Sequence, residues 1–440
     1  MKSNKYKQSP QNGNGKPVLI EGARTPFVKS FGAFQTSDAL ELFSRVVDGL
    51  LRKLELDPQH IDEISAGVVI PQTKNANVAR DAIINLGLPS HIHGATTNRA
   101  CASSLHTIAE AARTIATGNP HLILSGGVEC LSDVPIAYSR QARDFLAKLS
   151  KTKSVGAKLQ LLGEFKLKSW IPQPPAIAEP LTGLSMGQHC EMMAQKNNIS
   201  RAAQDEFALN SHLKAAKAWE SGFFNDEVVP VSVAPKYSEW VDRDNMVRGD
   251  TSFEKLSQLR PAFDRLYGSL TPGNSSPLTD GASITLIADE QRARDLGLKP
   301  KARVVEAEFV GIDPYDQLLI GPALAIPLLL KRCKLSMKDI DLFEIHEAFA
   351  AQVLSCVQAM GSAEFCERNF GHSQAFGDIP FDKLNVNGGA IAIGHPFGAT
   401  GARLVNSLAN ALKVRKGRYG VIAICAAGGM AGAMLIENIA

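Results

Sequence analysis

ASSLHTIAEAARTIATGNPHLILSGG, residues 102–127, carries the pattern that decides the fold. Its first half repeats apolar residues at the spacing of one helix face. These residues are Leu105, Ile108, Ala109, Ala112 and Ile115. Gly118 ends the predicted helix, and HLILS at 121–125 is typical of a short strand covered on both faces. The stretch therefore predicts a helix followed by a buried strand, the unit of an α/β architecture.

The same order of features returns near the C-terminus. A predicted helix after Gly398 has leucines at four-residue steps, at 404, 408 and 412, and it is followed by Gly417. A strand at 419–424 and a glycine pair at 428–429 complete the second unit. Further strands are predicted at 18–20, 283–287 and 341–345. Two similar units far apart in the chain indicate a duplicated core with one active site between its halves.

Composition excludes several classes of protein. The formal net charge of +3 on 440 residues gives no global signal for a nucleic-acid partner. No apolar run approaches the roughly 18 residues that span a membrane. The seven cysteines contain no C-x-x-C pair, so we expect neither a disulfide framework nor a structural metal site. Residues 1–16 lack the apolar stretch of a secretory signal, which predicts a disordered tail on a cytoplasmic protein.

Prolines and uneven charge distinguish the middle of the chain from its ends. Residues 131–262 predict an inserted loop domain over the core, with a long helix at 201–221. The expected organisation is an N-terminal domain at 17–290, which carries this insertion, and a C-terminal domain at 296–440.

Cys101 lies among small residues at the turn before the first predicted helix, in NRACASSLH at 98–106. Unpaired N–H groups and the helix dipole at such a position favour a reactive thiolate. The alternative is a small buried hydrophobic residue, the usual role of a free cysteine.

Three further stretches place chemical groups at similar turns. HEAFA at 346–350 puts His346 directly after a predicted strand, although a histidine satisfied by backbone hydrogen bonds is an equal alternative. In NGGAIAIGHPFGATGAR at 387–403, glycines around His395 let the backbone approach a ligand, and neither common phosphate-loop pattern is present. ICAAGGMAGAM at 424–434 places Cys425 beside glycines whose N–H groups suit an oxyanion hole. Together they supply a nucleophile, a base, a second proton carrier and anion-stabilising groups.

The chain resembles the thiolases, which are acetyl-CoA acyltransferases, from about Val18 to its C-terminus. Seven motifs match in order: EGARTPF, NRACASS, RPAFD, TPGNSSPLTDGAS, HEAFA, GHPFGATGAR and CAAGGM. The resemblance implies a thiolase fold, with two similar αβ halves in five layers (αβαβα) and an inserted loop domain. It also implies a 3-ketoacyl-CoA thiolase that uses CoA to release acetyl-CoA and a shortened acyl-CoA in fatty-acid β-oxidation. CoA is a substrate in this chemistry, and no metal or cofactor is expected.

The resemblance also assigns roles to residues. Cys101 is the nucleophile that becomes acylated, His395 favours its thiolate, and Cys425 protonates the enolate of acetyl-CoA. His346 and His395 line the oxyanion hole for the enolate. The N–H groups of Cys101 and Ala427 hold the tetrahedral intermediate. The residues implied for CoA binding are Met186, Arg248, Phe263, Ser276 and Phe349.

His346 departs from the asparagine that most of the family carries. HEAF is instead similar to the thiolase β-subunits of trifunctional β-oxidation complexes. This resemblance implies a homodimer, or a heterotetramer with a hydratase/3-hydroxyacyl-CoA dehydrogenase subunit.

Residues 138–170 hold eight Lys or Arg against Asp144 and Glu164, with apolar residues between them. This composition predicts docking to an anionic membrane surface or to the partner subunit, and a solvated face over the CoA site is the alternative.

Three rival functions are less consistent with the sequence. A 3-ketoacyl synthase shares the fold but lacks an equivalent of Cys425. A biosynthetic acetoacetyl-CoA thiolase runs the same chemistry in reverse, and HEAF with the long insertion favours degradation. A lipid-binding thiolase-like protein is expected to lose one of the four catalytic groups, and all four are present.

Overall fold

A computed structural model describes residues 15–118, 121–163, 165–172, 178–233 and 235–440. These residues divide into two units. The main unit contains the described residues up to 69, 77–133 and 178–440, and the helical unit contains 70–76 and the described residues of 134–177. Much of the predicted insertion at 131–262 thus packs with the main unit. The predicted domain limits at 17–290 and 296–440 stay predictions, and residues 1–14 of the predicted tail lie outside the described residues.

The main unit is built on a ten-stranded sheet with the order β10-β11-β12-β9-β1-β8-β5-β3-β4, and β2 pairs with β8. The strands are β1 (Pro17–Arg24), β2 (Val28–Lys29), β3 (Glu63–Gly67), β4 (His93–Thr97), β5 (Leu122–Glu129), β8 (Thr279–Asp289), β9 (Ala302–Gly311), β10 (Leu342–Ile345), β11 (Tyr419–Ala426) and β12 (Met430–Asn438). A separate ribbon joins β6 (Val231–Ser232) to β7 (Trp240–Val241). All the strands predicted from the sequence are confirmed.

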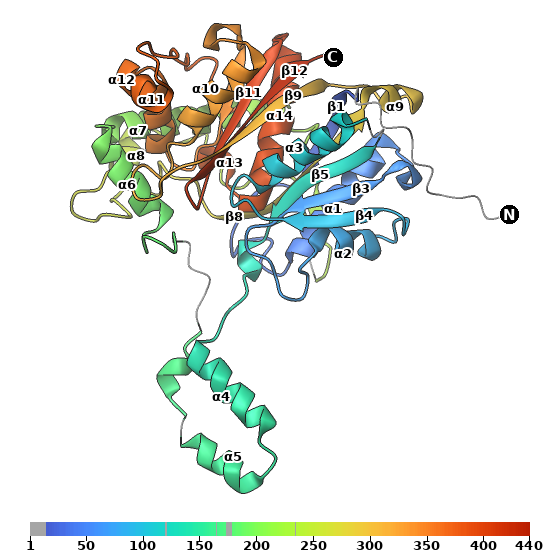
Figure 1. The fold of residues 1–440 in the computed structure, drawn as a ribbon, viewed down its shortest axis with the longest axis vertical. Coiled ribbons are helices and arrows are strands. Elements are labelled where there is room, and N and C mark those ends of the chain that lie inside the picture. The colour runs from blue at the N-terminus through green and yellow to red at the C-terminus, as the bar shows by residue number, and fades with distance from the viewer. Residues whose placement is uncertain (1–14, 119–120, 164, 173–177, 234) are drawn as a thin grey trace, which may run out of the picture. The chain divides into compact units, whose positions relative to one another are not determined.

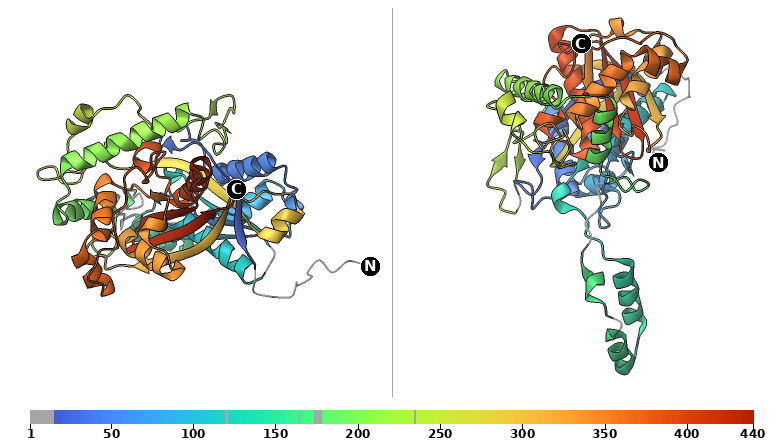
Figure 2. Two further views of the ribbon diagram at one scale, coloured as in Figure 1. Left: turned by 90° about the horizontal axis from the view of Figure 1, so that it is seen from above. Right: turned by 90° about the vertical axis from the view of Figure 1, so that its left-hand side faces the viewer.

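The two halves of the sheet have matching pairings. β3 pairs in parallel with β5, and β10 pairs in parallel with β11. β5 then runs antiparallel to β8, as β11 runs antiparallel to β12. β1 pairs with both β8 and β9 and so joins the halves. Figure 2 shows the N-terminal elements (blue to cyan) and the C-terminal elements (orange to red) of the main unit gathered on different sides.

Two helices lie between the halves. α3 (Ser103–Ala116) and α14 (Thr400–Arg415) pack against each other and against strands of both halves (Figure 1). Their contact is close, because a Cβ on Gly401 would lie 2.4 Å from the backbone nitrogen of Leu105. Ile123 and Ile422 point into this central layer, whereas Leu124 and Val421 point to the outer faces. Both strands are therefore covered on both faces, as their continuous apolar sequence predicts.

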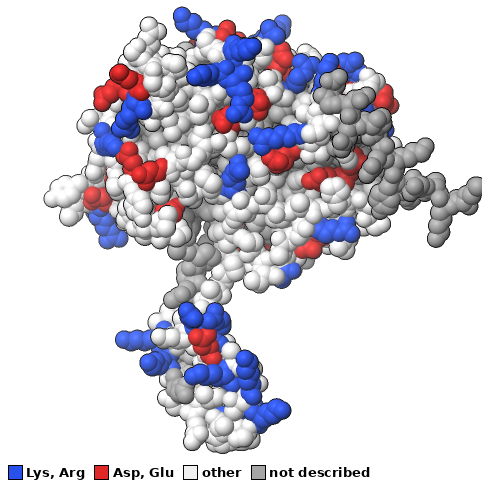
Figure 3. Space-filling model, viewed as in Figure 1, with Lys and Arg blue, Asp and Glu red and all other residues white. Residues whose placement is uncertain are grey.

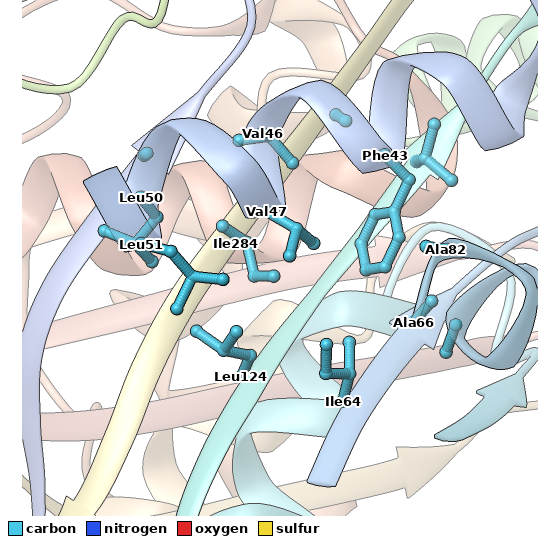
Figure 4. Close-up of a cluster of buried hydrophobic side chains, with 14 of the residues drawn as sticks. Phe43, Val46, Val47, Leu50, Leu51, Ile64, Ala66, Ala82, Leu124 and Ile284 are labelled. Atoms are coloured by element: carbon cyan, nitrogen blue, oxygen red, sulfur yellow. The ribbon is translucent and has the colours of Figure 1, made fainter. Parts of the chain in front are cut away.

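Outer helices complete the five layers. α1 (Ala39–Leu54) covers the first half, and its apolar stripe packs Phe43 and Val47 above Ile64, Leu124 and Ile284 (Figure 4). Each such buried side chain stabilises the fold by about 1.5–3 kcal/mol. α10 (Pro322–Cys333) covers the second half against β9 and β12. The expected αβαβα thiolase fold is thus confirmed.

The remaining helices of the main unit surround this core. They are α2 (Val78–Asn85), α6 (Met186–Lys196), α7 (Arg201–Glu220), α8 (Phe253–Ser257), α9 (Glu290–Asp295), α11 (Ala350–Met360), α12 (Ala363–Phe370) and α13 (Ala390–Ile393). α7 confirms the long helix predicted at 201–221. The helical unit holds α4 (Arg140–Lys151), α5 (Val155–Leu162) and the 3-10 turn η3 (Leu167–Trp170). Within the described ranges, no helix has both the length and the apolar character needed to cross a membrane.

Candidate active site

The four catalytic candidates come from both halves of the main unit. Cys101 precedes α3, His346 follows β10, His395 lies between α13 and α14, and Cys425 lies in β11. His395 Nε2 is 3.3 Å from Cys101 Sγ, and the rings of His346 and His395 have their centroids 4.1 Å apart. A charge on Cys101 raises the pKa of Cys425, which places the two thiols within electrostatic reach. The structure therefore gathers residues that are up to 324 positions apart in the chain.

A strained turn presents the Cys101 thiol. Ala100 has a φ of 46°, in the left-handed region that a residue with a Cβ adopts at a cost. The turn is held because Asn98 Oδ1 accepts the Ala100 N–H and Ser103 Oγ donates to the Ala100 carbonyl. The backbone N–H groups of Ala427 and of Cys101 itself act on the sulfur and lower the pKa of the thiol, against the larger effect of burial. The predicted oxyanion donors thus already converge on the thiol.

The Cys101–His395 pair is neutral at rest. Burial, together with the nearby charge of Glu129, raises the pKa of the Cys101 thiol to about 12, against the opposing effect of the two N–H groups. Burial, together with the charge of Arg403, lowers the pKa of His395 to about 3. In the unliganded protein desolvation therefore favours the neutral thiol, because it outweighs the N–H groups at the helix start. The thiolate must form as its proton moves to His395.

His346 has an unusual environment for a buried histidine. It is fully buried, and within the described ranges neither ring nitrogen has a hydrogen-bond partner. The alternative of a ring satisfied by backbone bonds is therefore wrong. Burial, with the nearby His395 and Arg403, holds the pKa of His346 well below its usual range, so the ring is neutral and carries one N–H. An unpaired buried donor is costly unless a ligand accepts from it.

Glu347, which sequence reasoning did not single out, anchors the HEAFA turn. Its buried carboxylate accepts from Ser211 Oγ at 2.6 Å, from Asn385 Nδ2 at 2.7 Å and from the Ile391 N–H at 3.2 Å. These bonds tie the turn to α7 and to the segment before His395. Gly389 is required here, because a Cβ would lie 2.4 Å from Glu347 Oε1. In the sequence, the signal that could have identified Glu347 is its position as an acidic residue directly after the candidate catalytic His346.

A second carboxylate holds the loop after Cys425. Glu179 Oε2 accepts a hydrogen bond from the Gly428 N–H at 2.9 Å, and Glu179 is buried. Gly428 and Gly429 have φ values of 80° and 64°, which glycine adopts without strain. This geometry keeps the neighbouring Ala427 N–H directed at Cys101.

Several of the predicted CoA-binding residues contact one another or border a hollow next to the catalytic groups. Phe263 and Phe349 meet edge to face, 5.8 Å apart, and Phe263 fills the space in front of Gly187, which follows Met186 at the start of α6. The Ser276 N–H donates to the carbonyl of Ala348, next to Phe349. Arg248, which is exposed, lines a hollow of about 390 Å³ with Lys255, Pro277 and others. The Pro277 carbonyl oxygen accepts a hydrogen bond from the backbone N–H of His395, and this bond connects the hollow to the catalytic groups.

Comparisons with known proteins agree with this geometry. Residues 17–291 match the family model of the thiolase N-terminal domain, and residues 298–438 match that of the thiolase C-terminal domain. The chain is 41% identical to the 3-ketoacyl-CoA thiolase of Shewanella pealeana over 432 residues, which covers 98% of this chain and 99% of that protein.

Solved structures give the same result. The Bacillus anthracis acetyl-CoA acetyltransferase is similar with a TM-score of 0.82 and 32% identity, over 97% of this chain and 100% of that one. Human mitochondrial 3-ketoacyl-CoA thiolase is similar with a TM-score of 0.80 and 30% identity, over 97% and 99% of the two chains. The same human enzyme has also been solved in complex with CoA, again with a TM-score of 0.80 and 30% identity, over 96% and 98%.

Proposed function

The chain belongs to the thiolase family, and from this premise we propose that it is a 3-ketoacyl-CoA thiolase in which Cys101 carries the acyl group. One observation carries the assignment of the residues. His395 Nε2 lies 3.3 Å from Cys101 Sγ, while the Ala427 backbone N–H lowers the pKa of the same thiol. A base and an oxyanion donor thus meet at one thiol, which is the arrangement that acyl transfer requires.

Acylation follows from this arrangement. The Cys101 proton passes to His395 Nε2 as the sulfur attacks the C3 carbonyl of the 3-ketoacyl-CoA. The carbonyl becomes an oxyanion held by the N–H groups of Cys101 and Ala427. When the oxyanion collapses, the C2–C3 bond breaks, and its electron pair leaves on C2 as the enolate of acetyl-CoA.

The enolate is then stabilised and protonated. The unpaired N–H of His346, together with protonated His395, donates to the enolate oxygen. Cys425 gives its proton to C2, because burial raises the pKa of this thiol far above its ordinary value and so keeps it protonated until a strong base arrives. Acetyl-CoA leaves, and Cys425 is left as a thiolate.

Transfer to CoA restores the starting state. The Cys425 thiolate takes the proton of the incoming CoA thiol, whose sulfur attacks the thioester on Cys101. The Cys101–acyl bond breaks, a shortened acyl-CoA is released, and His395 returns its proton to Cys101. In this proposal Arg248 binds the nucleotide end of CoA, and Met186, Phe263, Ser276 and Phe349 contact the pantetheine.

Turnover of purified protein on 3-ketoacyl-CoAs of increasing chain length tests the proposed function. We expect acetyl-CoA and the acyl-CoA two carbons shorter in equal amounts, formed only when free CoA is added. Turnover confined to the four-carbon substrate would favour the biosynthetic alternative. Binding of acyl-CoA without any product would instead identify a lipid-binding protein and contradict the proposal.

We further propose that the helical unit docks on an anionic membrane surface. Phe145, Phe165 and Trp170 form an aromatic cluster, with centroid distances of 5.3–5.8 Å, that holds α4 and η3 together. α5 presents Val155, Leu159 and Leu162 along one face, each more than half exposed. These spacings of four and three residues form a continuous apolar stripe.

Basic residues accompany this stripe. Exposed lysines lie on and beside α5 and η3, and Figure 3 shows Lys and Arg spread over much of the helical unit. Lys151, Lys153, Lys158, Lys166 and Lys168 make up the lysine set that the experiment changes. Near an anionic surface each basic residue contributes about 1 kcal/mol, and salt screens this attraction.

Sedimentation with vesicles tests the docking proposal. We expect the protein to bind vesicles that contain anionic lipid at low salt, to release at high salt, and to lose binding when the lysine set is changed to Glu. A control with the exposed main-unit lysines 331, 334, 338, 413 and 416 changed to Glu has the same charge change and should still bind. Equal sedimentation of both variants would contradict a membrane role. Loss of a co-purifying partner subunit from the first variant alone, without vesicle binding, would instead identify a protein-docking surface.

The quaternary structure implied by the resemblance also belongs to this proposal. β4 ends the sheet, and His93 and Ala95 on it are exposed. An open strand edge can pair with a second copy, which supports a homodimer. The heterotetramer with a hydratase/dehydrogenase subunit and the cytoplasmic location stay predictions. Light scattering on the protein with and without its co-purifying partners tests the assembly.

A further inference from the structure

Thr400, the first residue of α14, contacts the side of the His395 ring that faces away from Cys101. Its Oγ1 is 2.7 Å from His395 Nδ1 and 3.0 Å from the Pro396 carbonyl oxygen. Thr400 is fully buried and His395 is 4% exposed, so water does not compete for these contacts. The hydroxyl therefore bonds to the imidazole and to the backbone one helical turn earlier.

When the 2.7 Å and 3.0 Å contacts are both taken as hydrogen bonds, the number of protons determines their directions. A hydroxyl has one proton, and a carbonyl oxygen can only accept. The bond to Pro396 therefore uses the Thr400 proton, in the way that serine and threonine side chains bond to a carbonyl four residues earlier. The hydroxyl then offers a lone pair to Nδ1, so Nδ1 must carry the ring proton. Nε2 is left with its lone pair directed at the Cys101 thiol.

From this geometry we propose that Thr400 is a positioning residue that fixes the tautomer of His395, so that Nε2 is available to take the Cys101 proton. The inference rests on the proposed function and adds to it a residue that touches neither substrate nor thiol. The orienting group is a neutral hydroxyl, where serine proteases use a carboxylate for the same purpose.

The surroundings of the ring explain why an uncharged acceptor is sufficient. The titratable or charged groups near His395 include Cys101 before α3, His346 after β10, Arg403 on α14, and Glu129, which accepts from the Gly398 N–H. Arg403 is fully buried and opposes a second positive charge on His395. The Thr400 lone pair favours the protonated ring, and it also holds the ring plane that brings Nε2 to 3.3 Å from the thiol.

Thr400→Val is the informative substitution because valine has the same shape without the hydroxyl. Nδ1–H then has no acceptor, and the Nε2–H tautomer, which cannot act as a base, becomes accessible. We expect acylation of Cys101 by acyl-CoA to slow by about 10²-fold, the lower end of general-base effects, with little change in KM. Thr400→Ser keeps the hydroxyl and should stay close to wild type.

Alkylation of Cys101 by iodoacetamide provides a readout that does not need turnover. At neutral pH the Val variant should react more slowly than the Ser variant, and the difference should shrink as the pH rises towards the raised pKa of the Cys101 thiol, where hydroxide removes its proton directly. Cys333, a half-buried cysteine on α10, serves as the internal reference in the same mass spectra. A general packing defect would change the rate by the same factor at every pH.

Nitrogen-15 NMR of histidine-labelled wild type decides the question even if the Val variant fails to fold. We expect His395, assigned by its loss in a His395→Asn sample, to carry its proton on Nδ1. A proton on Nε2, or a Val variant whose alkylation profile matches that of the Ser variant, would overturn the inference. Inactivity of the wild type towards every 3-ketoacyl-CoA, with Nδ1 protonated, would contradict the proposed function alone.

Discussion

Replacing Cys101 with alanine is expected to lower thiolysis on the order of 10⁶-fold, the size of effect seen when an enzyme loses its nucleophile. In the alanine variant His395 has no thiol proton to accept. The backbone N–H groups of residues 101 and 427 also have no tetrahedral intermediate to stabilise. Binding of CoA should change little, because the residues proposed to bind CoA do not include Cys101. The measurement is kcat together with the Kd for CoA.

Cys333→Ala is the matched control for this substitution. Both cysteines are half-buried in the described structure, but Cys333 lies at the end of α10, outside the catalytic group. The control should keep wild-type activity. Substantial thiolysis by the Cys101 variant would show that the acyl group is carried elsewhere or that CoA attacks the substrate directly.

Cys425→Ser is expected to separate the two half-reactions. Carbon–carbon cleavage should fall by about 10²–10⁴-fold, because only this step needs a proton delivered to carbon and a serine hydroxyl is a much weaker acid than a thiol. Acylation of Cys101 by an acyl-CoA should lose far less, because CoA is a stable thiolate and can leave even when Cys425 does not supply the proton. The measurement compares single-turnover cleavage of a 3-ketoacyl-CoA with burst acylation by a simple acyl-CoA.

The buried Cys356 provides the control for this second substitution. It lies on α11 in the same hydrophobic cluster as Cys425, so Cys356→Ser introduces a comparable buried hydroxyl. That variant should cleave normally. Equal losses in the two variants would mean that the effect arises from packing, and normal cleavage by Cys425→Ser would assign the proton to another group.

Local patterns predicted the parts of the fold that depend on neighbouring residues. The stripe from Leu105 to Ile115 and the apolar run at 121–125 specify α3 and β5, because helix and strand periods are visible within one segment. The strand pairing that joins the two halves of the sheet was not predictable from such local patterns. β1 pairs with β8 and β9 across more than 250 residues, and such long-range pairing leaves no periodic signal.

The same distinction applies to the candidate site. Cys101, His346, His395 and Cys425 stand in motifs that are recognisable along the sequence. The roles of Glu347 and Glu179 depend on contacts with segments more than 30 residues away. The effect of burial on Cys101 was not predictable, because a helix N-terminus is visible in the sequence, whereas the desolvation that raises the pKa of the thiol appears only after folding.

Trapping the acyl group tests the central claim most directly. The protein is mixed with a short acyl-CoA, quenched in acid and digested, and the mass of each cysteine peptide is measured. We predict that the peptide with Cys101 gains the mass of one acyl group and loses it again when free CoA is added before quenching. An acyl group on Cys425, or on neither cysteine, would contradict the account.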